Sequence, residues 1–440
     1  MNYMNYSLLF LFFTTGLLAQ DVEFLTKDAA VSEVLQNNFG IIIAKNNLNI
    51  AENNKKLLNS GYLPSVTGNA GANYNKDDQE VTFQDGSVNK VDGVETTRYN
   101  ASVNLAYTLF DGLGRWYDYK RFKEEYNLSE LEVRETIETT ILQLFSVYYE
   151  VARLTENNTV LEETFQNTKS RLERAEYKFD YGQSNKLEVL NAEVDLVTDS
   201  INLMLARQQL VNTKRDLNVV TNEKNLERTF EVDTLVVFTN PLQLEGFLEA
   251  VDSSNVRLLQ ANQDVLISDY NYKASKAIYL PSVGLTGSYG WNEGNFPATN
   301  FLSSSTTTGL GAGISLRWSL FDGGKGITSV KNARIQHTNQ NIFKEQIRSE
   351  VKRDVANAKG NYINRLAIYE LLEQNVVTAK DNYNRSNERY KLGQITSVEL
   401  RQAQINLLNA RTNKNLAKYQ AKLAELELLQ LTGQLLNTDF

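Results

Sequence analysis

Few side chains in this sequence could carry out covalent or metal chemistry. The chain of 440 residues contains one histidine and no cysteine. That histidine, His337, falls in a long helical run, where a solvated position is far more common than a catalytic or metal-binding one. The glycines of 309–313 belong to an alternating strand pattern and therefore form no phosphate-binding loop. The sequence predicts no enzyme, no metal site and no cofactor, and the lack of cysteine excludes disulfides and a lipidated N-terminal cysteine.

Two glutamates occupy equivalent places in the chain. The segments 182–188 and 393–399 each begin with Gly-Gln and end with glutamate. Glycine readily adopts the left-handed conformation that ends a helix. Three residues before the glutamates stand Asn185 and Thr396, which can cap the helix that follows. Each segment therefore reads as a helix stop, a tight turn and a capping box that starts the next helix.

These segments belong to a longer internal repeat. Three motifs occur twice in one order: Tyr-Leu-Pro-Ser-Val at 62–66 and 279–283, Leu-Phe-Asp-Gly at 109–112 and 320–323, and Gly-Gln at 182–183 and 393–394. The offsets are 217, 211 and 211 residues. A repeat of this kind determines how the whole fold is read. It predicts two homologous halves, 21–222 and 223–433, followed by a short C-terminal tail, 434–440.

The N-terminus carries a targeting pattern. The apolar run 8–18 is too short to span a bilayer as a helix, and Ala19-Gln20 and polar sequence follow it. Residues 1–20 therefore read as a secretory signal peptide, with cleavage near Ala19 or Gln20. No other segment approaches 18 consecutive apolar residues, so a mature protein in a membrane would cross it as strands. The net charge of −8 gives no electrostatic footprint for nucleic acid.

Four segments alternate with a period of two: 66–74, 101–109, 283–291 and 310–320. One face of each is apolar with aromatic residues near an end, and the other carries mainly Gly, Ser, Thr and Asn. This pattern is typical of a transmembrane β-barrel. A soluble sheet with one face on a core is the alternative. The secretory signal and the scarcity of Lys and Glu on the polar faces favour the membrane.

Four strands are too few to close a barrel, which needs about eight. We therefore expect the protein to oligomerise and so remove its sheet edges. The hairpins 66–110 and 283–321 are expected to carry long extracellular loops at 75–97 and 292–308. Arg317 falls on the polar face and should point into the barrel, where it could bias the lumen or pair with a neighbouring carboxylate.

Long helices are expected to follow each strand hairpin. Asp111 and Asp322 are suitable N-caps for helices over about 113–181 and 324–391, each roughly 100 Å long at 1.5 Å per residue. Return helices are expected at 184–222 and 395–433.

A further helix is expected before each first strand, at about 28–61 and 245–279. In each half, this helix and the return helix placed end to end would match the length of the long helix. Each half then contributes two columns of equal height. Four helical columns and four strands have the same multiplicity, so one symmetry axis can close both into coaxial tubes.

Taken together, the duplicated motifs resemble the TolC family of outer-membrane efflux proteins. The resemblance covers nearly the whole mature chain, and its third motif reads Gly-x-x-[Ser/Thr]-x-x-Glu-[Val/Leu]-x-x-Ala. It implies an α+β membrane protein in which three subunits form a 12-stranded outer-membrane barrel continued by a periplasmic α-helical barrel. It also implies docking to a periplasmic adaptor (membrane fusion) protein and, through it, to an inner-membrane transporter. Residues 223–244 and those after 433 would contribute to an equatorial belt.

The resemblance also assigns roles near the two glycines. The adaptor-contacting tips would be Gly182, Gln183, Ser184, Gly393, Gln394, Ile395 and Thr396. Glu188 and Glu399 stand where family tips often carry acids that form a cation-favouring aperture, although capping is the competing role. Tyr390 stands where members can place a tyrosine of the closing network. Ile395 replaces an arginine and Gln402 an acid of some members, which puts their salt-bridged lock in doubt here.

The sequence is compatible with two functions. The first is a passive exit duct for a tripartite efflux or type I secretion system. The alternative is a secreted trimeric coiled-coil stalk or adhesin without a conducting lumen. A stalk has no need of four amphipathic strands at matching places in both halves, so the sequence favours the duct.

Overall fold

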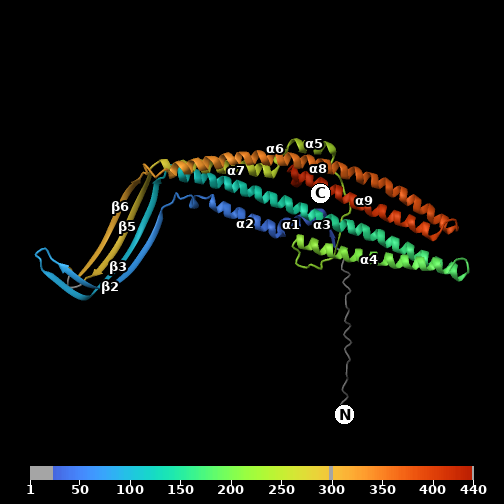
Figure 1. Cartoon of the computed structure of the whole chain (residues 1–440), viewed down its shortest axis with the longest axis horizontal. Helices are drawn as coiled ribbons and strands as arrows, with labels where there is room; N and C mark the ends of the chain where they lie inside the picture. The colour runs from blue at the N-terminus through green and yellow to red at the C-terminus, as the bar shows by residue number, and fades with distance from the viewer. Residues whose placement is uncertain (1–22, 297–300, 439–440) are drawn as a thin grey trace, which may run out of the picture.

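The computed structural model describes residues 23–296 and 301–438. They form an elongated molecule with a sheet at one end and long helices over the rest, and the sheet bends away from the helical axis (Figure 1). The expected signal peptide, residues 1–20, lies outside the described residues.

The four long strands form one antiparallel sheet. Its order is β2-β3-β5-β6, with bounds Ser65–Thr82, Val88–Phe110, Ser282–Asn295 and Ser304–Arg317. The β3–β5 pairing joins the two hairpins. Within the described part of the chain, β2 and β6 each have a strand on one side only. The sheet is therefore open at both edges.

The strand register brings the predicted faces into line. Val103 lies opposite Tyr289, which lies opposite Leu310. The next row holds Asn104, Ser288 and Gly311. Because side chains alternate between the faces of a strand, one face of the sheet is apolar around these rows and the other carries small and polar side chains. Arg317 lies opposite Ser282 in a row of the polar face.

The first hairpin differs from its prediction. Residues 75–97 were expected to be a loop, but they continue both strands, and only 83–87 form the turn. Cross-strand ion pairs support this extension, Lys76 with Glu95 at 3.2 Å and Lys90 with Glu80 at 2.7 Å. Opposite charges across an antiparallel ladder stabilise it where no apolar alternation is present.

The second hairpin also has a shorter loop than expected. β5 continues to Asn295 and β6 begins at Ser304, so the loop predicted over 292–308 is shortened from both sides. At its other end, β6 stops at Arg317, before the expected limit near residue 320.

The long helices are α3 (Gly114–Asp180) and α8 (Lys325–Lys391), each of 67 residues and so about 100 Å long. The return helices are α4 (Lys186–Val220) and α9 (Ser397–Leu431), each of 35 residues.

The two aspartates before the long helices do cap them, although from outside the helix. The cap positions themselves are Leu113 and Gly324, both in the left-handed conformation. Asp111 accepts the backbone N–H of Arg115 at 2.9 Å, and Asp322 accepts that of Gly326 at 2.7 Å. These carboxylates thus satisfy N–H groups that have no partner within the helix.

The helices before the strands are broken where single helices were expected. The segment 28–61 forms α1 (Lys27–Asn37) and α2 (Phe39–Asn54), and 245–279 forms α5 (Pro241–Glu249), α6 (Val251–Ser254) and α7 (Val256–Ser275). Three short 3₁₀ turns span Leu57–Asn59, Lys276–Tyr279 and Leu435–Asn437.

Asparagine causes the two main breaks. The Asn38 side chain accepts the N–H of Gly40 at 2.9 Å, and that of Asn255 accepts the N–H of Leu258 at 3.1 Å. A short side chain that bonds nearby backbone ends one helix and starts the next.

Helix α3 is the central packing element. It contacts α2 and α7 in the half nearer the sheet, and α4 and α9 in the half nearer the tips (Figure 1). At mid-length its buried Tyr148 donates to Leu25 O at 2.8 Å and accepts from the N–H of Asp233 at 3.0 Å. These bonds attach the small parallel sheet of β1 (Glu23–Leu25) and β4 (Phe230–Val232) to the helices. The main apolar core lies at this level.

Candidate functional site: the tips of the helical hairpins

The tips are two turns of matching geometry. Gly182 and Gly393 have φ of +70° and +74°, so both occupy the left-handed region. In the first tip Gly182 N–H donates to Phe179 O at 2.9 Å, and Gln183 N–H donates to Lys178 O at 2.7 Å. Gly393 and Gln394 repeat these bonds in the second tip. This is the Schellman arrangement, and it confirms the helix-ending role that the sequence assigned to the glycines.

The capping box is complete only at the second tip. There Glu399 N–H donates to Thr396 Oγ1 at 3.2 Å, and Thr396 N–H donates to the Glu399 carboxylate at 2.8 Å. At the first tip Asn185 accepts the N–H of Glu188 at 3.1 Å, but the Glu188 carboxylate does not return to the cap backbone. The two glutamates therefore differ in role: the Glu399 carboxylate caps its own helix, and the Glu188 carboxylate does not.

Glu188 joins the two helical hairpins instead. Its carboxylate accepts the Ser184 hydroxyl and, at 2.8 Å, the hydroxyl of Tyr390 from α8. Tyr390 is only 2% exposed, although it lies close to the tip. The sequence singled out both residues but gave no reason to pair them.

The ionisation of this pair follows from its surroundings. Partial burial works to raise the pKa of Glu188, but the hydrogen bonds from Ser184 and Tyr390 outweigh it and hold the pKa below its ordinary 4.5. Burial, and then the bond to Glu188, raise the pKa of Tyr390 to about 12. The phenol is therefore a firm donor and the carboxylate a charged acceptor at neutral pH.

Other predicted residues stand apart from this link. Ile395 is half-buried, and Gln402 is exposed and donates to Asn406 on its own helix at 2.9 Å. Arg317, far away in the sheet, is exposed and forms no ion pair with any residue that the structure describes.

A stronger connection between the hairpins lies further along the helices and was missed from the sequence. Arg401 of α9 binds Asp199 of α4 through two bonds, of 2.7 and 2.8 Å. Thr168 of α3 also donates to Asp199 at 2.7 Å, and Gln404 donates to Thr168 at 2.9 Å. Asp199 is 3% exposed, so its charge depends on these partners.

A signal for this network was present in the sequence. The buried positions Val189, Ala192, Asp199 and Leu203 lie on one stripe of α4, and Asp199 is the one carboxylate among them. A carboxylate at a buried position of an apolar stripe needs a charged partner. The sequence does not say which arginine supplies it, because that depends on how α9 packs against α4.

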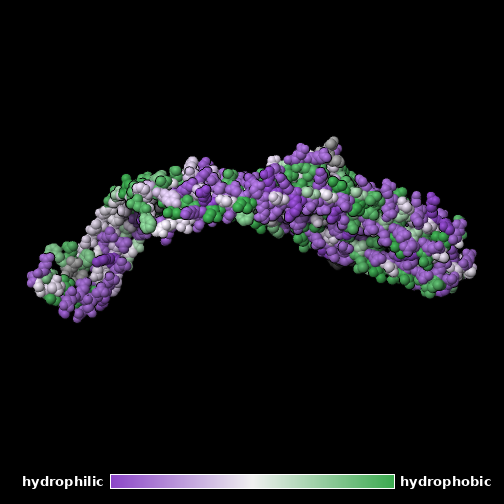
Figure 2. All heavy atoms as spheres, turned by 45° about the horizontal axis from the view of Figure 1, so that its top comes forward, coloured by the Kyte–Doolittle hydropathy of each residue, from purple (hydrophilic) through white to green (hydrophobic). Residues whose placement is uncertain are grey.

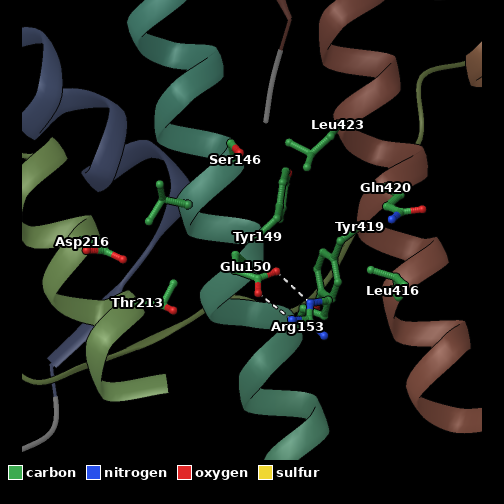
Figure 3. A pocket seen from close by; sticks show the side chains of 11 residues that line it. Ser146, Tyr149, Glu150, Arg153, Thr213, Asp216, Leu416, Tyr419, Gln420 and Leu423 are labelled. Atoms are coloured by element: carbon green, nitrogen blue, oxygen red, sulfur yellow. Dashed lines mark hydrogen bonds and ion pairs between the residues drawn. The ribbon is translucent and has the colours of Figure 1, made fainter. Parts of the chain in front are cut away.

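A separate pocket of about 400 Å³ lies at mid-length (Figure 3). Figure 3 shows its lining side chains coming from α3, α4 and α9. Glu150 and Arg153 pair with each other at 2.7 Å, and the rings of Tyr149 and Tyr419 lie 5.7 Å apart. Among residues 23–296 and 301–438, His, Asp and Glu form no group that could hold a metal ion. None of the described helices combines the length and apolar character needed to cross a membrane.

Comparison with known proteins shows which family this chain resembles. The family model described as outer membrane efflux protein matches residues 30–223 and 248–434. Outer membrane protein TolC of Vibrio cholerae is 22% identical over 382 residues, covering 86% of this chain and 84% of that protein. Outer membrane efflux protein BepC of Brucella suis is 20% identical over 419 residues, covering 93% and 88%.

The fold agrees with these sequence matches. The crystal structure of the Campylobacter jejuni CmeC outer membrane channel superposes with a TM-score of 0.75 at 17% identity, covering 93% of this chain and 86% of that one. The proteins to which this chain is similar are channels, which are transport proteins rather than enzymes. The chain belongs to the outer membrane efflux protein family, and its location is the outer membrane.

Proposed function

We propose that three copies of this chain form an outer-membrane channel-tunnel that gives substrates a passive exit from the cell. A periplasmic adaptor docks at the tips and links the tunnel to an inner-membrane transporter, which supplies the energy. Four strands from each copy would make a 12-stranded barrel, and the helices would continue it into the periplasm.

The observation that carries this proposal is the open, two-faced sheet. Its outer strands β2 and β6 leave rows of backbone groups without strand partners within the described chain. In the rows of Val103 and Leu105, one face carries no polar side chain on any of the four strands. Lipid cannot hydrogen-bond free backbone groups, so an apolar sheet in a bilayer must be closed into a barrel.

The helical end supports the same assembly. Figure 2 shows apolar side chains among the polar ones on the surface at the end where the tips lie. Six of the large apolar side chains exposed on α4 recur at alternating spacings of three and four residues: Leu187, Leu190, Val194, Val197, Ile201 and Met204. That spacing is a coiled-coil seam without a partner in the single chain. A neighbouring subunit would cover it.

A stalk or adhesin without a lumen is the weaker account. It explains the seam on α4 but leaves the apolar face of the sheet without a purpose. The family match covers both the helical and the strand regions of the chain, which also favours the channel.

The division into two homologous halves, 21–222 and 223–433, belongs to this proposal. The family model matches in two segments, and α3 and α8 are equal in length, as are α4 and α9. One half therefore serves as a template for contacts that the other half makes with a neighbouring subunit.

Within the channel, the two tips would be the docking surface and the residues beside them the aperture. The tips lie at the end of the molecule remote from the sheet (Figure 1), where a periplasmic partner has access. Glu188 and Tyr390 would hold the aperture closed through their hydrogen bond, with Glu399 and Gln402 exposed nearby on α9.

Cross-linking of the sheet edges tests the proposed assembly. Carrying the observed pairing of Val103 with Tyr289 over the repeat offsets of 211 and 217 residues sets Ile314 opposite Ala72 of the next subunit. The chain has no cysteine, so Ala72→Cys with Ile314→Cys provides a unique thiol pair. Residues directly opposite on antiparallel strands have Cβ atoms about 5 Å apart. A short thiol-reactive cross-linker should yield covalent dimers and trimers.

The matched control moves one thiol by one residue. Asn73→Cys with Ile314→Cys places the two thiols on opposite faces of the sheet. This variant should cross-link poorly. Equal cross-linking of both pairs, or none of either, would contradict closure through β2 and β6.

A further inference from the structure

We propose that each subunit binds a tetrahedral oxyanion of the phosphate or sulfate class in a pocket between its two helical hairpins, close to the tips. This site is independent of the channel function, because it is formed within one chain.

The pocket lies where three helices meet. It encloses about 190 Å³ and is lined mainly by polar side chains from α3, α8 and α9. Since water occupies about 30 Å³ per molecule in the liquid, this volume accommodates an oxyanion with a few waters. The pocket adjoins Tyr390, whose hydroxyl is already engaged by Glu188.

Arg171 is the residue that points to a ligand. It is 5% exposed, and one terminal nitrogen, Nη2, pairs with Asp195. Its Nε and Nη1 are buried and have no partner among the described residues. A guanidinium carries five N–H donors, and leaving charged donors unsatisfied inside a protein is strongly unfavourable. Arg171 lines the pocket, so an acceptor bound there would lie beside this incompletely paired guanidinium.

The remaining charges of the pocket also favour an anion. Arg174 lies one turn after Arg171 on α3 and forms no ion pair within the described chain. Like charges at this spacing repel each other on a helix, and an anion between them reverses the effect. Lys391 lines the pocket as well, although Glu388 neutralises it at 2.6 Å.

The geometry favours an oxyanion over chloride. The unpartnered Nε and Nη1 of Arg171 point in different directions, so with Arg174 they call for several acceptor oxygens, which one phosphate or sulfate supplies and one chloride does not. Tyr383 and Asn387 of α8 also line the pocket. Burial raises the pKa of Tyr383, so its hydroxyl remains a donor. An oxyanion held by Arg171 and Arg174 of α3 and by Tyr383 of α8 would bridge the two hairpins.

Binding of inorganic phosphate to the detergent-solubilised full-length protein tests the site. Isothermal titration at constant ionic strength should detect binding of phosphate to the wild type, and chloride should not compete. Arg174→Gln should weaken the affinity roughly tenfold or more, since a charge-assisted hydrogen bond is lost. Arg174 has no structural ion pair, so this variant is expected to assemble like the wild type.

Arg207→Gln is the matched control, because it removes one positive charge from the same hairpin at the exposed pair with Glu162. It should leave phosphate affinity unchanged. Hydrogen exchange should show phosphate protecting both 167–174 and 383–391 in the wild type but not in Arg174→Gln. No binding at millimolar phosphate, equal affinity in Arg174→Gln, or protection of α3 alone would overturn the proposal.

Discussion

Beside the tips, a hydrogen bond from Tyr390 to Glu188 joins the two hairpins. Three features make it suited to hold an aperture. The phenol is buried, the acceptor is charged, and Ser184 fixes the carboxylate from the other side. A hydrogen bond to a charged group contributes about 1.5–3 kcal/mol. A contact of that size can set the position of a closed-to-open equilibrium.

Tyr390→Phe should open the channel more often. The substitution removes only the hydroxyl, so the ring still fills its place while Glu188 loses one donor. Open probability in planar bilayers should rise by about tenfold or more, as expected for a bond of this strength. Tyr369→Phe is the control, because that hydroxyl donates to Glu373 on its own helix at 2.6 Å. If both variants behave like the wild type, the bond does not hold the aperture.

Acidification should weaken the same link. The pKa of Glu188 lies below its ordinary 4.5 in the folded protein. Its contribution to the proposed closed aperture would therefore be complete above pH 4.5 and be lost as the pH falls through the lowered value. Bilayer conductance should rise in that acidic window. Glu188→Gln should show a flatter response, and an unchanged acid response in that variant would assign the effect to other groups.

The ion pair of Arg401 with Asp199 predicts a large effect of one side chain on the free energy of unfolding. Arg401→Ala would leave the buried Asp199 without its guanidinium, a change that costs about 3–5 kcal/mol. Denaturant unfolding followed by the helical circular dichroism signal should show this loss. Arg411→Ala, on the same helix, breaks a pair with the exposed Glu163 and should cost at most about 1 kcal/mol. Similar losses in both variants would refute a special role for Asp199.

At the scale of helices and strands, most of the correct predictions came from periodic patterns in the sequence. Alternation located four strands and their faces, and the glycines located both tips, because those signals are local. The breaks at Asn38 and Asn255 were missed, since asparagine is tolerated in helices and caps only when tertiary packing favours a break. The extension of β2 and β3 through 75–97 was missed because charged cross-strand pairs leave no apolar alternation. The partners of Glu188 and Asp199 depend on packing between hairpins, which no local pattern encodes.

The faces of the sheet give a prediction at this scale. Leu105 and Asn104 are neighbours on β3, in apolar and polar rows respectively. Leu105→Arg should reduce assembly in the outer membrane, because a charge facing lipid costs about 2–4 kcal/mol near the bilayer midplane. Asn104→Arg should be tolerated in a wet lumen. The amount of heat-resistant oligomer in outer-membrane fractions measures the difference, and equal losses would show that the assignment of faces is wrong.

At the scale of the whole molecule, the sheet and the helical end both expose surfaces that need a partner. The sheet exposes the unpaired edges of β2 and β6, and the helical end exposes the apolar seam on α4. One rotational symmetry axis would satisfy both at once, since closed rotational symmetry is the usual arrangement of identical subunits. The long helices would set the closed sheet and the closed helical end about 100 Å apart. The single-chain structure therefore fits the proposal that each chain is one sector of a tube.

Conductance of the purified oligomer in planar lipid bilayers tests that central claim most directly. The cross-linked Ala72→Cys and Ile314→Cys protein is the best material, because its subunits are held at the proposed edges. It should insert and give discrete conductance steps, which increase when Tyr390→Phe is added. A stable, inserted oligomer that passes no ion current with or without that substitution would contradict the account.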